Sequence, residues 1–179
     1  MIQSQDELNQ WYKNEDPWDY ETTADDIKRR DMLLNTLPNR KFKNVLDIGC
    51  GHGYITRELP GENIIGIDLS QDAINQAKEL STKKGKNIRY LVGDFFDLPN
   101  SLKNAKFDLI VVTGVLYPQY IGKSFSLSYL IIDELLEKNG ILASVHINEW
   151  YSASFPYLKL EQKYYDYRTF THDLQVYTK

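Results

Sequence analysis

Short apolar runs alternate along this chain with longer segments of helical period. The runs are rich in β-branched residues and lie at 45–49, 64–68, 88–92, 107–112 and 141–147. The helical segments lie at 25–37, 71–84 and 124–138, and Asn139–Gly140 is suited to stop the last of them. Because parallel strands need long crossovers, which are usually helical, the alternation predicts a parallel sheet with helices on both faces.

The last part of the sequence has a different pattern. Residues 161–170 and 173–178 alternate polar and apolar side chains like an antiparallel hairpin, with His172–Asp173 near its turn. We therefore expect an α/β fold with a Rossmann-like, doubly wound, seven-stranded sheet, mostly parallel with an antiparallel C-terminal hairpin. With 179 residues, the chain is expected to form a single domain, in which 1–40 is an N-terminal cap and 41–179 the catalytic core.

Composition excludes several classes of protein. The one cysteine, Cys50, cannot form an internal disulfide or a cysteine-based zinc site, and we expect no metal. The net charge of −4 is unlike that of a nucleic-acid-binding protein, so no nucleic-acid partner is expected. The N-terminus lacks a signal-peptide pattern, and no apolar run is long enough to span a membrane. These features predict a cytoplasmic protein without a membrane partner.

A glycine-rich loop follows the first expected strand. Its sequence, Asp47-Ile48-Gly49-Cys50-Gly51-His52-Gly53, allows the backbone to turn tightly and to approach a ligand. A helix near 54–59 is expected to point its N-terminus at that ligand. The dinucleotide fingerprint needs a third glycine where this chain has Tyr54, and Gly122-Lys123-Ser124 lacks the leading glycine of a phosphate-binding loop.

Carboxylates stand at three successive strand ends. Asp47 would repel a diphosphate but suits a cationic ligand, and Asp68 has the offset of a residue that holds a ribose diol. Asp94 can accept a hydrogen bond from an exocyclic amine while Phe95 covers the ring. Together they predict a site for an adenosine with an amino-acid tail and no phosphate, which describes S-adenosyl-L-methionine.

Four segments carry a family resemblance: VLDIGCGHGYITREL, GIDLS, GDFFDLP and FDLIVVTGVLY. They resemble the class I S-adenosylmethionine-dependent methyltransferases, in order and spacing, over roughly residues 25–147. The resemblance implies that S-adenosyl-L-methionine is the methyl donor and S-adenosyl-L-homocysteine the product. The residues implied to bind it are Asp47, Gly49, Cys50, Gly51, Gly53, Asp68, Leu69, Asp94, Phe95, Thr113 and Gly114.

The segment DPWDYETTADDIKRRDMLLNTLP, at residues 16–38, narrows the resemblance. It is similar to the corresponding part of the NodS-like methyltransferases, which N-methylate an amino-sugar unit of a chito-oligosaccharide. This chain departs from that pattern at Asp25–Asp26, Gly114 and Pro118, which are positions near the acceptor. The resemblance therefore carries over better for the donor than for the acceptor.

Methyl transfer requires an aligned acceptor and, for a hydroxyl acceptor, a general base. We expect His146, or else Glu149, to be that catalytic residue. Aromatic residues are expected to form the acceptor pocket: Tyr12, Trp18, Tyr20, Tyr117, Tyr120 and Trp150. The sequence thus predicts a monomeric or homodimeric enzyme that methylates an N or O atom of a small molecule or glycan, most plausibly a sugar. A catalytically silent partner subunit and a methyltransferase acting on RNA or protein are the alternatives.

Overall fold

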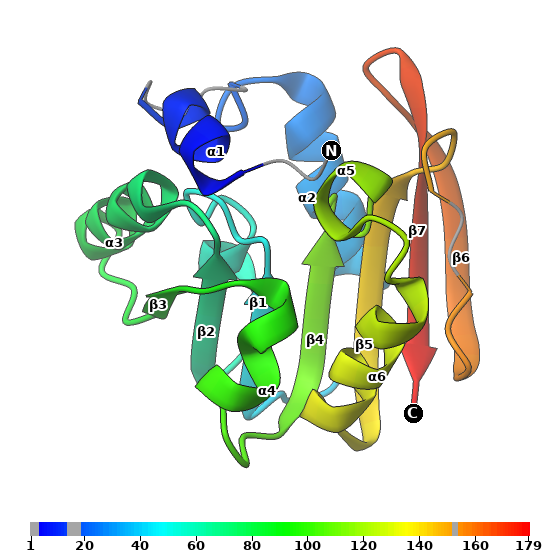
Figure 1. The fold of residues 1–179 in the computed structure, drawn as a ribbon. Helices are drawn as coiled ribbons and strands as arrows, with labels where there is room; N and C mark the ends of the chain where they lie inside the picture. The colour runs from blue at the N-terminus through cyan, green and yellow to red at the C-terminus, as the bar shows by residue number, and fades with distance from the viewer. Residues whose placement is uncertain (1–3, 14–18, 152–153) are drawn as a thin grey trace.

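The computed structural model describes residues 4–13, 19–151 and 154–179, and seven strands within them form one sheet (Figure 1). The strand order is β3-β2-β1-β4-β5-β7-β6, so the order reverses between β1 and β4. Neighbours among β1 to β5 pair in parallel, whereas β7 pairs antiparallel with both β5 and β6. The strands are β1 (Asn44–Ile48), β2 (Asn63–Asp68), β3 (Arg89–Val92), β4 (Phe107–Thr113), β5 (Leu136–Ile147), β6 (Leu158–Tyr167) and β7 (Phe170–Thr178). This topology confirms the expected fold class.

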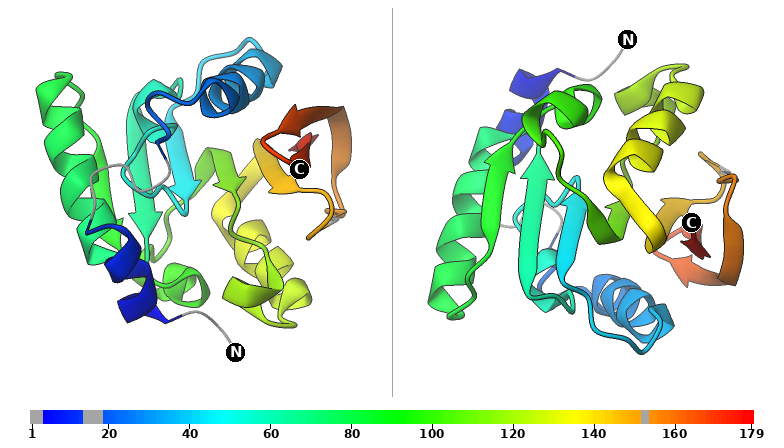
Figure 2. Two further views of the ribbon diagram at one scale, coloured as in Figure 1. Left: turned by 90° about the horizontal axis from the view of Figure 1, so that it is seen from above. Right: turned by 90° about the horizontal axis from the view of Figure 1, so that it is seen from below.

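Helices cover both faces of the sheet, as the two end-on views show (Figure 2). One face packs against Leu33 of α2, and the other against Ile131, Ile132 and Leu135 of α6. The helices are α1 (Gln5–Trp11), α2 (Ala24–Thr36), α3 (Gln71–Lys83), α4 (Leu98–Ser101), α5 (Pro118–Ile121) and α6 (Phe125–Leu135), with 3-10 turns η1 (Thr56–Glu58) and η2 (Phe95–Asp97). None of these described helices has the length and apolar character to cross a membrane.

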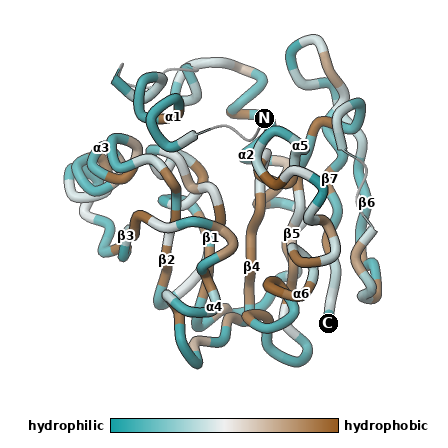
Figure 3. The backbone as a smooth tube through the Cα atoms, viewed as in Figure 1, coloured by the Kyte–Doolittle hydropathy of each residue, from teal (hydrophilic) through white to brown (hydrophobic). Residues whose placement is uncertain are grey.

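Strand β4 lies at the centre of the core. Leu109, Ile110, Val111 and Val112 have no exposed surface, although successive side chains point to opposite faces. The strand is accordingly hydrophobic along most of its length (Figure 3). Such a continuous apolar run is typical of a parallel strand that is covered by helices on both sides.

Helix α1 lies above the carboxyl ends of the parallel strands, next to the start of α3 (Figure 1). The Gln5 side-chain amide donates to the Leu69 carbonyl at 2.9 Å, and the Ser70 hydroxyl donates to Asn9 Oδ1 at 2.8 Å. These two contacts fix the N-terminal helix over the same edge of the sheet where the strand-end carboxylates stand.

Three local expectations were wrong. Helix α6 ends at Leu135 rather than near residue 138, because Leu136 is already extended (ψ 129°) and pairs with Phe107 of β4. The expected helix at 54–59 is only the 3-10 turn η1, so no helix N-terminus follows the glycine loop. The hairpin turns at Arg168, which has a φ of +54°, so His172 lies inside β7 and not at the turn.

Candidate active site

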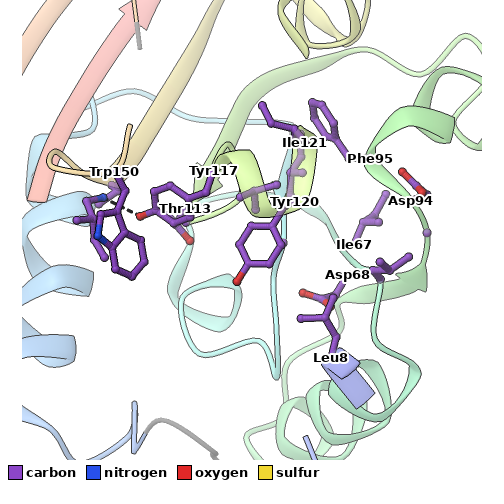
Figure 4. Close-up of a pocket in the computed structure, with 18 of the residues that line it drawn as sticks. Leu8, Ile67, Asp68, Asp94, Phe95, Thr113, Tyr117, Tyr120, Ile121 and Trp150 are labelled. Carbon is purple, nitrogen blue, oxygen red and sulfur yellow. Dashed lines mark hydrogen bonds between the residues drawn. The ribbon is translucent and has the colours of Figure 1, made fainter. Parts of the chain in front are cut away.

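A cavity of about 800 Å³ opens at the carboxyl ends of the parallel strands. Its walls come from the ends of β1, β2, β3 and β4, from α1, α2 and α5, and from the β6–β7 hairpin. Asp68 and Asp94 stand on one side of this cavity and Tyr117 and Trp150 on the other, with Tyr120 between them (Figure 4). The cavity lies at the switch point between β1 and β4, which is the usual ligand site of a doubly wound sheet.

The glycine loop forms the floor of the cavity at Gly49. This residue has a φ of +73°, and a Cβ placed on it would lie 2.2 Å from Cγ2 of Val115. Any other residue would be strained and would collide with the loop after β4. Gly49 therefore lets the end of β1 lie close against the Val115 side chain, while the N–H groups of Gly49 and Cys50 donate to the Ile67 carbonyl at 2.8 and 3.0 Å.

Asp68 lines the cavity at the end of β2. Its Oδ2 accepts from the Gly51 N–H and its Oδ1 from the Ser70 N–H, both at 2.9 Å. Burial raises the pKa of this carboxyl, while the backbone hydrogen bonds oppose that shift. Each oxygen keeps a further acceptor site, so the carboxylate is fixed in place and can still bind a pair of hydroxyls.

The end of β3 supplies a flat, apolar pocket. Asp94 lines the cavity and accepts from the Phe96 N–H at 2.8 Å, which starts the turn η2. The half-buried rings of Phe95 and Phe96 lie edge to face with centroids 5.5 Å apart. With Leu8 of α1 they bound a space suited to a planar base, as the sequence predicts for Asp94 and Phe95. Leu69, Thr113 and Gly114 also line the cavity.

Four residues expected to touch the donor do not line the cavity: Asp47, Cys50, Gly51 and Gly53. Asp47 is buried beneath the loop, where its Oδ2 accepts from the Thr56 hydroxyl at 2.6 Å. Burial raises the pKa of its carboxyl to about 6. Asp47 therefore supports the loop from below, and the carboxylate that faces a ligand on this side is Asp68.

The aromatic residues of the predicted acceptor pocket largely come together. Tyr12, Tyr20, Tyr117, Tyr120 and Trp150 line the cavity, whereas Trp18 is outside the described residues. The Tyr117 hydroxyl accepts from the Ile147 N–H at 2.7 Å, and its ring meets that of Trp150 edge to face at 5.4 Å. These contacts attach the loop after β4 to the end of β5 and hold the wall together.

The two residues expected to act as general base lie elsewhere. His146 is buried, and its Nε2 accepts from the Leu116 N–H at 3.2 Å. Its Nδ1 must then carry the proton and donate to Ser144 Oγ at 3.0 Å. Glu149 accepts from the Thr171 N–H with both oxygens, at 3.0 and 3.2 Å. Neither residue lines the cavity, so neither is placed to contact an acceptor bound there, contrary to expectation.

A second wall of the cavity is absent from the sequence-based prediction: Arg29, Tyr167, Arg168, Phe170 and His172. The His172 Nδ1 pairs with the Tyr165 hydroxyl at 3.2 Å, and its ring stacks on Tyr167 at 3.9 Å. Burial, and then the nearby Arg29, lower the pKa of His172 to about 3. The signal that could have predicted this wall is the position of the hairpin turn. A turn at Arg168 places His172 in β7, where it pairs with Ile147 at the cavity end of β5.

Residues 39–176 match a protein-family model described as a methyltransferase domain. Among curated relatives, Nodulation protein S of Rhizobium tropici is 31% identical over 118 residues, which are 64% of this chain and 47% of that protein. A putative tRNA methyltransferase of Mycoplasma pneumoniae is 40% identical over 80 residues, 41% of this chain and 37% of that protein. The chain thus spans less than half the length of these curated relatives.

A solved structure shares the whole fold. N-methyltransferase NodS from Bradyrhizobium japonicum WM9, crystallised with S-adenosyl-L-homocysteine, superposes with a TM-score of 0.79. The alignment covers 97% of both chains at 21% sequence identity. At that identity the likeness extends to the arrangement of the sheet, the helices and the C-terminal hairpin.

Proposed function

We propose a function from the premise that the chain belongs to the methyltransferase domain family. The protein transfers a methyl group from S-adenosyl-L-methionine to an N or O atom of a small molecule, namely a sugar or sugar derivative. The observation that carries this proposal is one continuous cavity with two different halves. One half has carboxylates and an apolar slot for a nucleoside, and the other is walled by aromatic rings.

The donor half fits the proposed cofactor. Asp68 would hold the ribose hydroxyls, and Phe95 would cover the adenine, with Asp94 near its exocyclic amine. Gly49, Thr113 and Gly114 would lie along the methionyl part. When bound, the donor supplies an electrophilic methyl group on a sulfonium.

The acceptor half is lined by Tyr20, Tyr117, Trp150, Tyr167 and Phe170. Aromatic faces bury the apolar side of a sugar ring, while their polar edges leave the ring hydroxyls hydrogen-bonded. The rings also keep water away from the transferring methyl group. Positioning alone supports transfer to a neutral amine, because an amine already presents its lone pair.

A hydroxyl acceptor would have to be oriented by a group that accepts its hydrogen bond, and His172 is the histidine that lines the cavity. Its lowered pKa, about 3, keeps the imidazole neutral near pH 7. If Nδ1 donates to Tyr165, Nε2 is an acceptor of hydrogen bonds. We therefore propose that His172 replaces His146 and Glu149 as the residue that orients the acceptor, within a cytoplasmic monomer or homodimer.

The test is to incubate the protein with methyl-labelled S-adenosyl-L-methionine and a fractionated lysate. Label in the glycan or metabolite pool, with Asp68→Ala inactive, supports the proposal and gives the acceptor for mass analysis. Label in RNA or protein contradicts the proposed acceptor class but leaves the donor site intact. If the donor binds and no fraction is labelled in lysates from several sources, the chain is a catalytically silent subunit.

A further inference from the structure

The charges on the cavity wall are separated by sign. Among the described residues that line it, the carboxylates are Asp68 and Asp94, at the ends of β2 and β3. The permanent cations are Arg29 of α2 and Arg168 of the hairpin turn, on the opposite wall. A ligand that fills this cavity therefore meets a positive side chain where it leaves the donor half.

Arg29 has unused hydrogen-bonding capacity. Its Nη2 lies 3.3 Å from Asp26 Oδ1, and its Nε is buried without a partner among the described residues. The guanidinium lies over the ring of Tyr20, with 4.6 Å between Cζ and the centroid, and over Tyr167 at 5.6 Å. Besides its contacts with Asp26 and Tyr20, this guanidinium has the buried Nε–H left for a ligand.

Asp26 has little acceptor capacity left for the Nε–H of Arg29. It is fully buried, its Oδ1 accepts from the Tyr167 hydroxyl at 2.8 Å, and its Oδ2 pairs with Arg168 Nη2 at 2.9 Å. Its oxygens are thus shared among three groups. An unpartnered buried N–H costs free energy, and an oxyanion is the group that a planar guanidinium binds best.

We propose that Arg29 is an oxyanion-binding residue, which receives a carboxylate or similar group of the bound ligand between the rings of Tyr20 and Tyr167. Two sources supply this chemistry. One is the carboxylate of the donor's methionyl part, and the other is an acidic group on the acceptor. The second source rests on the proposed function, and the first needs only donor binding.

The first arm compares two nucleosides by calorimetry. S-adenosyl-L-homocysteine carries the carboxylate, whereas 5′-methylthioadenosine has the same adenosine without the amino acid. If the donor is the source, Arg29→Gln weakens S-adenosyl-L-homocysteine roughly 10- to 100-fold and changes 5′-methylthioadenosine less than about twofold. Arg29→Lys, which keeps the charge but not the planar fork, recovers part of the loss.

The matched control is Arg30→Gln. Arg30 is the next residue of the same helix, pairs with Asp31 at 2.7 Å and does not line the cavity. This variant removes the same charge and should bind both nucleosides like the wild type. An equal loss of both nucleosides in Arg29→Gln would indicate general damage to the site and would overturn the proposal.

The second arm measures glucuronate and glucose binding to the protein saturated with S-adenosyl-L-homocysteine. If the acceptor is the source, the wild type prefers glucuronate, and Arg29→Gln abolishes that preference with nucleoside affinities unchanged. A wild type that binds neither sugar, combined with selective loss of S-adenosyl-L-homocysteine in Arg29→Gln, keeps the oxyanion site and counts against the sugar acceptor. Unchanged nucleoside affinity together with no preference for glucuronate overturns the proposal.

Discussion

The side chains near the cavity differ in how much hydrogen-bonding capacity they keep for a ligand. Asp68 and Arg29 illustrate this at opposite ends, since each is fixed by protein contacts and still has capacity for a ligand. His146 shows the reverse case, because both of its nitrogens are used inside the protein. Residue type alone does not separate these cases. The separation depends on where each side chain points once the strands have paired.

Replacing Asp68 by alanine should weaken S-adenosyl-L-homocysteine binding by roughly tenfold or more, because a charged acceptor for two hydroxyls is lost. Calorimetry measures this directly. The control is Asp133→Ala, which removes a half-exposed carboxylate that pairs with Lys179. Equal affinity for wild type and Asp68→Ala would remove Asp68 from the ribose site.

Replacing His146 by alanine should lower the free energy of unfolding by about 2–4 kcal/mol, because it leaves a buried cavity and an unpartnered Leu116 N–H. Urea denaturation gives this value. At temperatures where the variant is folded, donor affinity should match that of the wild type. A stable variant that has lost only turnover would restore His146 as a catalytic residue.

At the level of elements, the sheet could be predicted from the sequence better than the ends of its connections. The strands at 64–68 and 107–112 were located within a residue or so of β2 and β4, because their apolar runs are bounded by polar residues. The sequence pattern extends α6 to residue 138, because Asn139–Gly140 is typical of a helix end. In the structure Asn139 does have a positive φ, +61°, but both residues belong to β5. Pairing of Leu136 with Phe107 decides that boundary, and such a contact is not local in sequence.

Contacts between residues distant in sequence also limit how much of the candidate site can be predicted. Strand-end residues such as Asp68 and Asp94 could be predicted, because parallel strands bring their carboxyl ends to one edge. Arg29 and His172 could not, because they reach the cavity through packing of α2 against the hairpin. A turn expected at His172–Asp173 does not predict the second wall of the cavity, because His172 would then lie outside β7.

Helix α1 provides a prediction at this scale. Replacing Gln5 and Asn9 together by alanine removes the contacts to Leu69 and Ser70 that fix α1 over the cavity. We expect S-adenosyl-L-homocysteine to dissociate several-fold faster, measured by stopped flow, with little change in melting temperature. Gln10→Ala, on the exposed side of the helix, is the control. An unchanged off-rate would show that α1 does not retain the donor.

For the whole molecule, stability should depend on pH through two buried histidines. Burial lowers the pKa of both His146 and His172 to about 3 in the folded state, whereas unfolded histidine titrates near 6.5. The unfolded chain therefore binds more protons between these values, and the free energy of unfolding falls as pH decreases from about 7. Asp47, with a folded pKa of about 6, and Asp68, whose pKa burial also raises, act in the opposite direction as the pH falls below about 6.

The larger pKa shifts of the two histidines outweigh those of Asp47 and Asp68, so we expect the protein to be less stable at pH 5 than at pH 7, by about 2 kcal/mol. Urea denaturation at the two pH values measures the difference. His146→Asn should reduce the pH dependence, because one of the two titrating groups is removed. Equal or greater stability of the wild type at pH 5 would contradict the assignment of neutral buried imidazoles.

The position of β7 between β5 and β6 determines when the cavity can exist during biosynthesis. The donor half uses strand ends that are complete once residue 114 has been made, whereas the acceptor wall needs Tyr167, Phe170 and His172. A nascent chain that lacks residues 158–178 therefore contains the strand ends that line the donor half, but not the wall that faces them. Synthesis thus completes the residues of the donor half before those of the acceptor wall, and Asp26 of α2 gains its contacts with Tyr167 and Arg168 only when the hairpin has been made.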